Sequence, residues 1–233
     1  NPYRGCQHAC RYCFARGTHT YLDLDAGADF DSRIVVKANL VEVLERELAG
    51  PRRAVEAVQL GTNTDPYQRA EGRYRLMPGV LRALARHGAS ISILTKGTLL
   101  RRDLPLLTAI ARDVPVSVAM SIAIFDDRLQ QQVEPGTPTT RSRLATVGAV
   151  RDAGLDCAVF AMPVLPGLTD TREHLERAVQ QIADAGATSA IASALHLRPG
   201  AREWYLSWLQ EAHPHLMPLY GRVYGRGAYA KRE

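Results

Sequence analysis

The sequence predicts an α/β fold with a mostly parallel sheet. Five short apolar runs, beginning near residues 57, 91, 115, 157 and 189, alternate with amphipathic helical stretches. Such alternation is typical of a parallel sheet, because each parallel connection needs a crossover of a dozen or more residues, usually a helix. Polar residues follow most of these runs, at the strand ends where a parallel α/β fold collects its chemistry.

The helices are predicted from apolar residues repeating on one face. The first carries Leu40, Leu44 and Leu48 and stops near Gly50-Pro51, and the next two cover about 78–87 and 103–112. A fourth helix, with Leu144, Val147 and Val150, ends at Gly154. A fifth, within 169–186, is expected to present Leu175, Val179 and Ile182 on one face, and a last one carries Trp204, Tyr205 and Trp208 as packing residues.

The sequence predicts a single domain that comprises residues 1–233. Residues 1–37 are expected to form a long functional loop, 38–198 the βα units, and 199–233 a closing helix and a basic tail. With 46% apolar residues, 233 residues suffice for one substantial core. The start at Asn1 suggests an excised segment.

The composition limits the cellular compartment and the classes of binding partner that are expected for the protein. No apolar run is long enough for a membrane helix, and the first residues carry no secretory signal. Four cysteines are too few for a disulfide scaffold, so a reducing, cytoplasmic location is predicted. The net charge of +5 fits either a solvated arginine-rich surface or an anionic partner such as nucleic acid.

Three cysteines lie together near the start, as C-x3-C-x2-C at Cys6, Cys10 and Cys13. Thiolates select zinc or iron-sulfur centres, and closed zinc sites usually take four ligands. His8 is a fourth candidate, but it would crowd the flanking cysteines. Cys157 lies in an apolar strand, where a free cysteine acts as a small hydrophobe. Three thiolates on a 4Fe-4S cluster would leave one iron open to a cofactor.

Four motifs, "NPYRGCQHACRYCFAR", "TNTDPYQ", "LTKG" and "EPGTP", together resemble the spore photoproduct lyase branch, with its DNA repair photolyase-like proteins, of the radical S-adenosylmethionine (SAM) superfamily. The resemblance spans about residues 1 to 170. It implies a partial (β/α)6 TIM-like barrel, a radical SAM core whose first strand lies at or before Asn1. The cysteine loop would follow that strand.

The resemblance also implies cofactors and chemistry. Cys6, Cys10 and Cys13 would bind a 4Fe-4S cluster, and an electron from a flavodoxin- or ferredoxin-like donor would reductively cleave S-adenosylmethionine to a 5'-deoxyadenosyl radical. That radical would abstract hydrogen from an unknown substrate, which nucleic acid would suit. The cofactor-binding residues carried over are Tyr12, Thr62, Asn63, Thr64, Asp65, Lys96, Ser121 and Glu134.

Several of these residues have simpler structural interpretations. Asp65-Pro66 is also typical of an Asx turn, Lys96 of an exposed strand-end lysine, and Glu134 of a residue before a turn at Pro135-Gly136. Other polar residues are predicted on the same rim, at Leu165 to Gly167, His196 and Arg198, the last two as substrate-side candidates.

Two departures from the lyases concern hydrogen donation. Thr62 replaces their hydrogen-donating cysteine, and Phe14 replaces a tyrosine after the last cluster cysteine. Neither side chain gives up a hydrogen atom readily, so the protein is not expected to repair spore photoproduct. Tyr67 and Cys157 are replacement candidates.

The sequence also leaves two other functions to consider. One is a cysteine-metal-stabilised nucleic-acid-binding module without radical chemistry, and the tail "YGRVYGRGAYAKRE" would be either its flexible contact or a solvated end. The other is a metal-free hydrolase, but no nucleophile-elbow motif is present.

Overall fold

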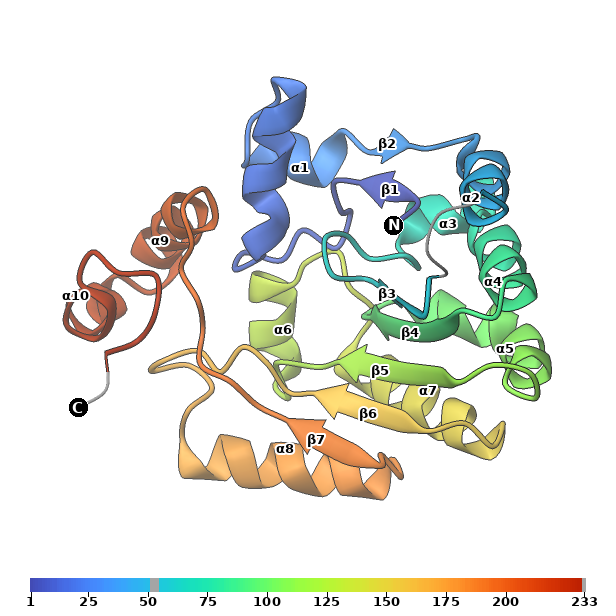
Figure 1. Cartoon of the computed structure of the whole chain (residues 1–233). Coiled ribbons are helices and arrows are strands. Elements are labelled where there is room, and N and C mark those ends of the chain that lie inside the picture. Colours follow the sequence, from blue (N-terminus) through green and yellow to red (C-terminus); the bar gives the residue numbers. More distant parts are fainter. Residues whose placement is uncertain (51–54, 232–233) are drawn as a thin grey trace.

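A five-stranded parallel sheet forms the centre of the protein (Figure 1). The computed structural model describes residues 1–50 and 55–231. Neighbouring strands follow chain order: β3 (Ala57–Leu60), β4 (Ser90–Thr95), β5 (Val116–Ser121), β6 (Cys157–Phe160) and β7 (Ser189–Ile191). Each strand begins within two residues of its predicted position. The prediction of an α/β fold with a parallel sheet is therefore confirmed.

The helices between the strands also follow the predicted order. They are α2 (Leu40–Leu48), α4 (Met77–Arg86), α5 (Leu104–Ile110), α7 (Thr140–Asp152) and α8 (Arg172–Asp184). The predicted stop at Gly50-Pro51 falls partly outside the described residues, since Pro51 is among the residues that the structure does not describe. Three short helices that the periodicity did not predict lie in strand-end connections: α3 (Arg69–Tyr74), η2 (Thr98–Asp103) and α6 (Asp127–Val133).

The main core lies between the central sheet and the helices α2, α4, α5, α7 and α8. Ile91, Ile93, Met120 and Val159 are buried in it. Cys157 is also fully buried there, as predicted for a core cysteine.

The predicted inner face of α8 is partly wrong. Leu175 is 39% and Val179 66% exposed, and the helix packs instead through His174, Ala178 and Ile182. The helix is rotated by about one residue from the expected face. β7, the strand that follows α8, is an edge strand of the sheet, so the sheet does not extend far enough to cover the whole apolar stripe of the helix.

Residues 1–37 are not the long loop that the sequence predicted. They contain β1 (Tyr3–Arg4), the 3₁₀ helix η1 (Phe14–Leu22), α1 (Ala28–Ser32) and β2 (Val35–Val36). β1 precedes the cysteines, but it pairs antiparallel with β2 and not with the central sheet. The segment forms structure because it has its own small core around Phe30.

The C-terminal residues fold back onto the cysteine-containing segment. α9 (Ala201–Ala212), η3 (Pro214–Leu216) and α10 (Met217–Tyr224) lie at one side of the sheet, and the arrows of β4 to β7 point toward that side (Figure 1). Tyr205, Tyr220 and Tyr224 are buried in a second core with Cys10 and Tyr12.

The predicted tail begins at Tyr220, and the prediction that it is solvated or flexible is wrong for residues 220–224, which form the end of α10. Burial of Tyr220 and Tyr224 outweighs the polar character that glycine and arginine give this stretch. Residues 232–233 lie outside the described part of the chain. Across residues 1–50 and 55–231, the structure contains no helix with the length and apolar character that membrane crossing requires.

Candidate active site

A cavity of about 400 Å³ opens where the strands end. Its wall combines the cysteine segment with residues at or just after the carboxyl ends of β3, β4, β5, β6 and β7. Leu94, Phe160 and Leu195 supply apolar parts of the wall. Since carboxyl ends of parallel strands are the usual place for ligands, this cavity is the candidate active site.

All three clustered cysteines line this cavity. Cys6 and Cys10 are buried, and Cys13 is half-buried. Burial raises the pKa of all three thiols; the carboxyl group of Asp65 adds to the effect at Cys6, and that of Glu134 at Cys10. Thiolates are therefore disfavoured here unless a cationic centre compensates their charge, which is what a bound metal cluster provides.

The backbone of the cysteine loop is held at both ends. The Cys6 amide donates to the Phe30 carbonyl at 2.9 Å, and the Arg11 amide donates to the Val133 carbonyl at 2.9 Å. Gly5 has a φ of +77°, and a Cβ there would lie 2.9 Å from the Phe30 oxygen, so this turn requires glycine. Within the described residues, no group of three His, Cys, Asp or Glu side chains is arranged to hold one metal ion.

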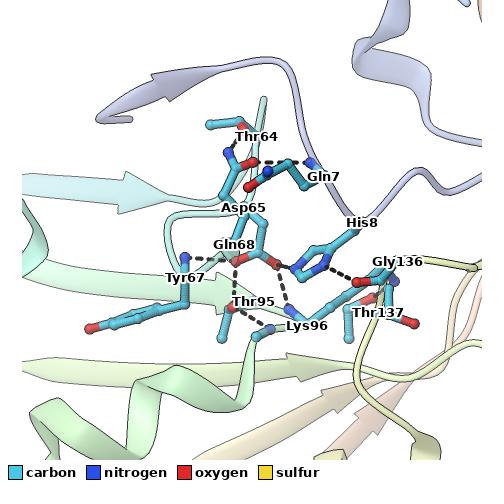
Figure 2. Close-up of polar contacts among 12 residues, drawn as sticks. Gln7, His8, Thr64, Asp65, Tyr67, Gln68, Thr95, Lys96, Gly136 and Thr137 are labelled. Atoms are coloured by element: carbon cyan, nitrogen blue, oxygen red, sulfur yellow. Dashed lines mark hydrogen bonds and ion pairs between the residues drawn. The ribbon is translucent and has the colours of Figure 1, made fainter. Parts of the chain in front are cut away.

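Asp65 is the centre of a buried network that ties the cysteine loop to two strand ends (Figure 2). Its Oδ1 accepts from the Tyr67 amide at 2.8 Å and from the Thr95 hydroxyl at 2.6 Å. Its Oδ2 accepts from the Lys96 amide at 2.6 Å and lies 3.1 Å from Nε2 of His8. The bond to the Tyr67 amide is the Asx turn that the sequence offered as the structural interpretation.

These contacts decide the charge of Asp65. Burial alone would raise its pKa, but His8, the Lys96 amide and the Thr95 hydroxyl outweigh burial, and the pKa lies below its ordinary value. Both carboxylate oxygens are already occupied by protein donors. Asp65 therefore shapes the wall of the cavity and has little capacity left for a cofactor amine.

His8 connects the cysteine loop to the loop after α6. Its Nδ1 lies 3.3 Å from the Gly136 carbonyl oxygen, while its Nε2 faces Asp65. A Cβ at Gly136 would lie 2.0 Å from the Gln7 oxygen, so the two loops approach too closely for another residue. With both nitrogens facing protein oxygens, His8 acts here as a bridge and not as a metal-ligand candidate.

Four residues named from the resemblance meet at one wall of the cavity, three on it and Glu134 behind it. The Lys96 ammonium donates to the Ser121 hydroxyl at 2.6 Å, lies 3.1 Å from Oε1 of Glu134 and sits 5.5 Å from the centre of the Tyr12 ring. The Tyr12 hydroxyl also donates to Oε1 of Glu134. Lys96, Ser121 and Tyr12 line the cavity.

Glu134 lies behind that wall and does not line the cavity, which argues against direct cofactor contact. Its Oε2 is 2.8 Å from the Arg143 guanidinium, and both side chains are fully buried. Burial would raise the pKa of Glu134, but Arg143 and Lys96 outweigh it and lower the pKa to about 2. Glu134 is therefore an ionised anchor for Tyr12 and Lys96.

The remaining predicted residues divide between the cavity and other places. Thr62, Asn63 and Thr64 line it; the Thr64 hydroxyl donates to the Gly5 carbonyl, whereas no hydrogen bond of the Thr62 or Asn63 side chain is found in the described part of the chain. Phe14, His196 and Arg198 also line it.

Other predicted residues lie elsewhere. Leu165 is buried in the second core, and Gly167 packs on Leu216, so this loop meets the C-terminal helices and not the cavity. Tyr67 lines a separate hollow of about 280 Å³, and Cys157 lies at the far end of β6. Neither is placed to donate hydrogen in the main cavity.

Sequence reasoning missed four contributors to this region: Arg16, Arg143, Met162 and Ser193. The last two line the cavity from the segments after β6 and β7. The two arginines are fully buried, and arginine is ordinarily a surface residue, so the sequence favoured solvent. The spacing of Arg16, three residues after Cys13, was the available clue.

The site is thus a strand-end cavity of a parallel α/β sheet, lined by three thiols and a lysine. The comparisons with known proteins specify the class. The model of the Radical SAM superfamily matches residues 1–182, so the chain belongs to that superfamily.

Relatives of the whole chain occur in mycobacteria. An uncharacterized protein of Mycobacterium tuberculosis is 58% identical over 229 residues, which cover 98% of this chain and 67% of that protein. An uncharacterized protein of the archaeon Methanocaldococcus jannaschii is 27% identical over 170 residues, covering 73% of this chain and 61% of the relative.

Solved structures agree on the fold. A spore photoproduct lyase variant with bound AdoMet and a dinucleoside spore photoproduct has a TM-score of 0.64 and 16% identity, covering 91% of this chain. SuiB of Streptococcus suis bound to S-adenosylmethionine has a TM-score of 0.58 and 13% identity, also covering 91% of this chain. This chain spans 59% of the lyase and 47% of SuiB.

Proposed function

We propose that this protein binds a 4Fe-4S cluster through Cys6, Cys10 and Cys13, binds S-adenosylmethionine in the adjoining cavity, and carries out a radical reaction on a substrate still to be identified. The observation that supports this most directly is the placement of all three thiols on one cavity in a chain of the radical SAM superfamily. The arrangement fits the cluster, because thiolates are the soft ligands that iron-sulfur centres take and three of them leave one iron free.

The single-zinc alternative has less support. A structural zinc site needs four ligands, and the described residues offer no group of three that could hold one ion. His8, the extra candidate, is turned to Asp65 and Gly136.

The cavity residues suggest how S-adenosylmethionine would be held. Thr62 and Asn63 offer uncommitted oxygen acceptors to its ammonium group, and Lys96 offers a cation to its carboxylate. Tyr12 presents a ring held by its bond to Glu134, which suits contact with adenine. Thr64 and Asp65 would act indirectly, by fixing the loop that carries Thr62 and Asn63.

When bound, the cluster and its cofactor supply a one-electron reductive cleavage of the sulfonium. This chain's residues orient the cofactor and limit water. Leu94, Phe160 and Leu195 form an apolar part of the wall. The side chain of Lys96 is only 13% exposed, so solvent has little access to the cationic side of the cavity. The electron donor, a flavodoxin- or ferredoxin-like protein, is part of the same proposal.

Nucleic acid is the substrate class to test first. The lyase neighbour is described with a dinucleoside ligand. At the cavity of this chain, the Arg198 guanidinium lies 5.6 Å from the centre of the Phe14 ring. His196 also lines the cavity, and its ring centre is 4.7 Å from that of Tyr229, which does not line it. Aromatic rings and arginine are suited to bases and phosphates.

Spore photoproduct itself is not the proposed substrate. Thr62 and Phe14, the two positions that differ from the lyases, both line the cavity in which the reaction is proposed to occur. Incubation of reconstituted protein with S-adenosylmethionine, reductant and dinucleoside spore photoproduct should yield no repaired thymine. Repair at the rate of a lyase control would contradict this part.

Electron paramagnetic resonance tests the central proposal. Anaerobically reconstituted, reduced protein should hold about four irons per chain, and its cluster signal should shift when S-adenosylmethionine is added. Deoxyadenosine should then form on reduction. A colourless zinc protein, or a cluster whose signal does not respond to S-adenosylmethionine, would support the nucleic-acid-binding module instead.

A further inference from the structure

Arg16 is a buried cation to which the proposed function assigns no role. It lies in η1, three residues after Cys13, and its side chain is fully buried. An arginine without solvent must find protein partners for its donors, and the identity of those partners shows what it holds.

The guanidinium is bonded to the cysteine loop itself. Nε and Nη2 both donate to the carbonyl oxygen of Cys10, at 3.2 and 2.9 Å. Nη1 donates to the Gly27 carbonyl at 2.9 Å, and Nη2 also donates to both carboxylate oxygens of Asp31, at 2.8 and 3.0 Å. One side chain therefore joins a cluster-ligand candidate to the turn before α1 and to α1.

Two aromatic rings contact this guanidinium. Its central carbon lies 5.2 Å from the centre of the Phe30 ring and 4.8 Å from that of Trp204, which comes from α9. A Cβ at Gly27 would lie 2.7 Å from the Trp204 ring, so glycine is what allows the approach. Helix α9 thereby contacts the cysteine loop through Arg16.

We propose that Arg16 is a positioning residue that fixes the cysteine loop and raises the reduction potential of the cluster held by Cys6, Cys10 and Cys13. Asp31 opposes its charge. This inference rests on the proposed function. A positive charge in a buried site stabilises the more negative, reduced state of a cluster, and hydrogen bonds and charges around iron-sulfur clusters set their potentials.

Arg16 and Asp31 carry opposite charges, so the inference predicts opposite shifts of the cluster's midpoint potential when each is removed. A purely structural role predicts no such opposite shifts. Removing the arginine charge, in R16Q, should lower the midpoint potential. Removing the carboxylate charge, in D31N, leaves Arg16 uncompensated and should raise the potential. R16K keeps the positive charge but loses the planar guanidinium that makes several hydrogen bonds at once. Its midpoint potential should therefore stay near wild type, while the protein should lose iron more readily.

The experiment is a redox titration of reconstituted protein, followed by the cluster's paramagnetic signal, without S-adenosylmethionine, at about pH 8, where carboxylates are ordinarily ionised. Iron content and the unfolding temperature of each variant are measured beside it. R33Q is the matched control, because Arg33 is 65% exposed and pairs with Asp29 on the surface at 3.0 Å; its potential should equal wild type.

Opposite shifts in R16Q and D31N would support the inference. Unchanged potentials in both, or shifts in the same direction, would overturn it. If R16Q retains no cluster, D31N and R16K decide: a D31N potential at or below wild type overturns the proposal. A wild-type protein that takes up no cluster would instead contradict the proposed function, so the two failures are distinguishable.

Discussion

The phenol of Tyr12 donates a hydrogen bond to the carboxylate of Glu134, although 122 residues separate them in the chain. Glu134 is also paired with Lys96 and Arg143, so one buried carboxylate joins the cysteine loop, the end of β4 and α7. Loss of that carboxylate would leave Arg143 as a buried cation without its partner.

Glu134 should make folding stability depend on acid. Its pKa falls from an ordinary 4.5 to about 2 in the folded protein. A carboxyl group with a depressed folded pKa contributes stability above its unfolded pKa, and that contribution is lost as the pH falls through the folded pKa. The loss should total roughly 3 kcal/mol between about pH 4.5 and pH 2.

E134Q isolates this effect in urea unfolding of the metal-free protein. At neutral pH, the variant should be less stable than wild type by about 3 to 5 kcal/mol, because the buried Arg143 and the half-buried Lys96 lose their partner. The difference should shrink as the pH falls toward 2. E176Q is the control, since Glu176 is 63% exposed, and its cost should stay within about 0.5 kcal/mol. A difference independent of pH would contradict the assigned charge.

Substitutions in the loop after β3 should separate cofactor binding from folding. T62A and N63A remove groups without a hydrogen bond in the described part of the chain, so the free energy of unfolding should change by no more than about 0.5 kcal/mol. Each should weaken S-adenosylmethionine binding about tenfold, the effect of a lost hydrogen bond to a charged group.

T64V provides the contrast. The Thr64 hydroxyl donates to the Gly5 carbonyl and accepts from Gln68 at 3.0 Å, so its loss should cost about 1 to 3 kcal/mol of folding stability. Calorimetric titration of reconstituted protein and urea unfolding of each variant measure the two quantities. Equal S-adenosylmethionine affinity in T62A, N63A and wild type would remove both residues from the proposed site.

The four cysteines should fall into two groups by iron content. C6A, C10A and C13A should each retain little iron after reconstitution, because three thiolates are already the minimum proposed for the cluster. C157A should retain the wild-type amount, since Cys157 is buried in the main core away from the cavity, and should cost about 1 kcal/mol of stability. Iron loss in C157A alone would contradict the assignment.

The order of strands and helices could be predicted from the sequence because each element carries its own apolar period. Leu40, Leu44 and Leu48 fall on one helix face whatever lies opposite them. The strand ends then brought Thr62, Lys96 and Ser121 to one cavity, because the carboxyl ends of parallel strands share an edge.

Contacts that depend on the packed structure could not be predicted in this way. Arg16 and Arg143 are buried only because carbonyl groups and carboxylates from distant segments receive their donors. The bridge from His8 to Asp65 and Gly136 depends on the close approach of two loops. Local periodicity contains no information on such pairs.

The exposed side of α8 shows the same limit and gives a prediction of its own. The sequence placed Val179 and Ile182 on one inner face, yet Val179 is 66% and Ile182 5% exposed. I182A should therefore cost about 2 to 4 kcal/mol, because it leaves a cavity under the helix. V179A should change stability by no more than about 0.5 kcal/mol, since alanine also favours the helix. Urea unfolding of both variants compares the two faces directly, and a cost at Val179 equal to that at Ile182 would mean that α8 packs by the face the sequence predicted.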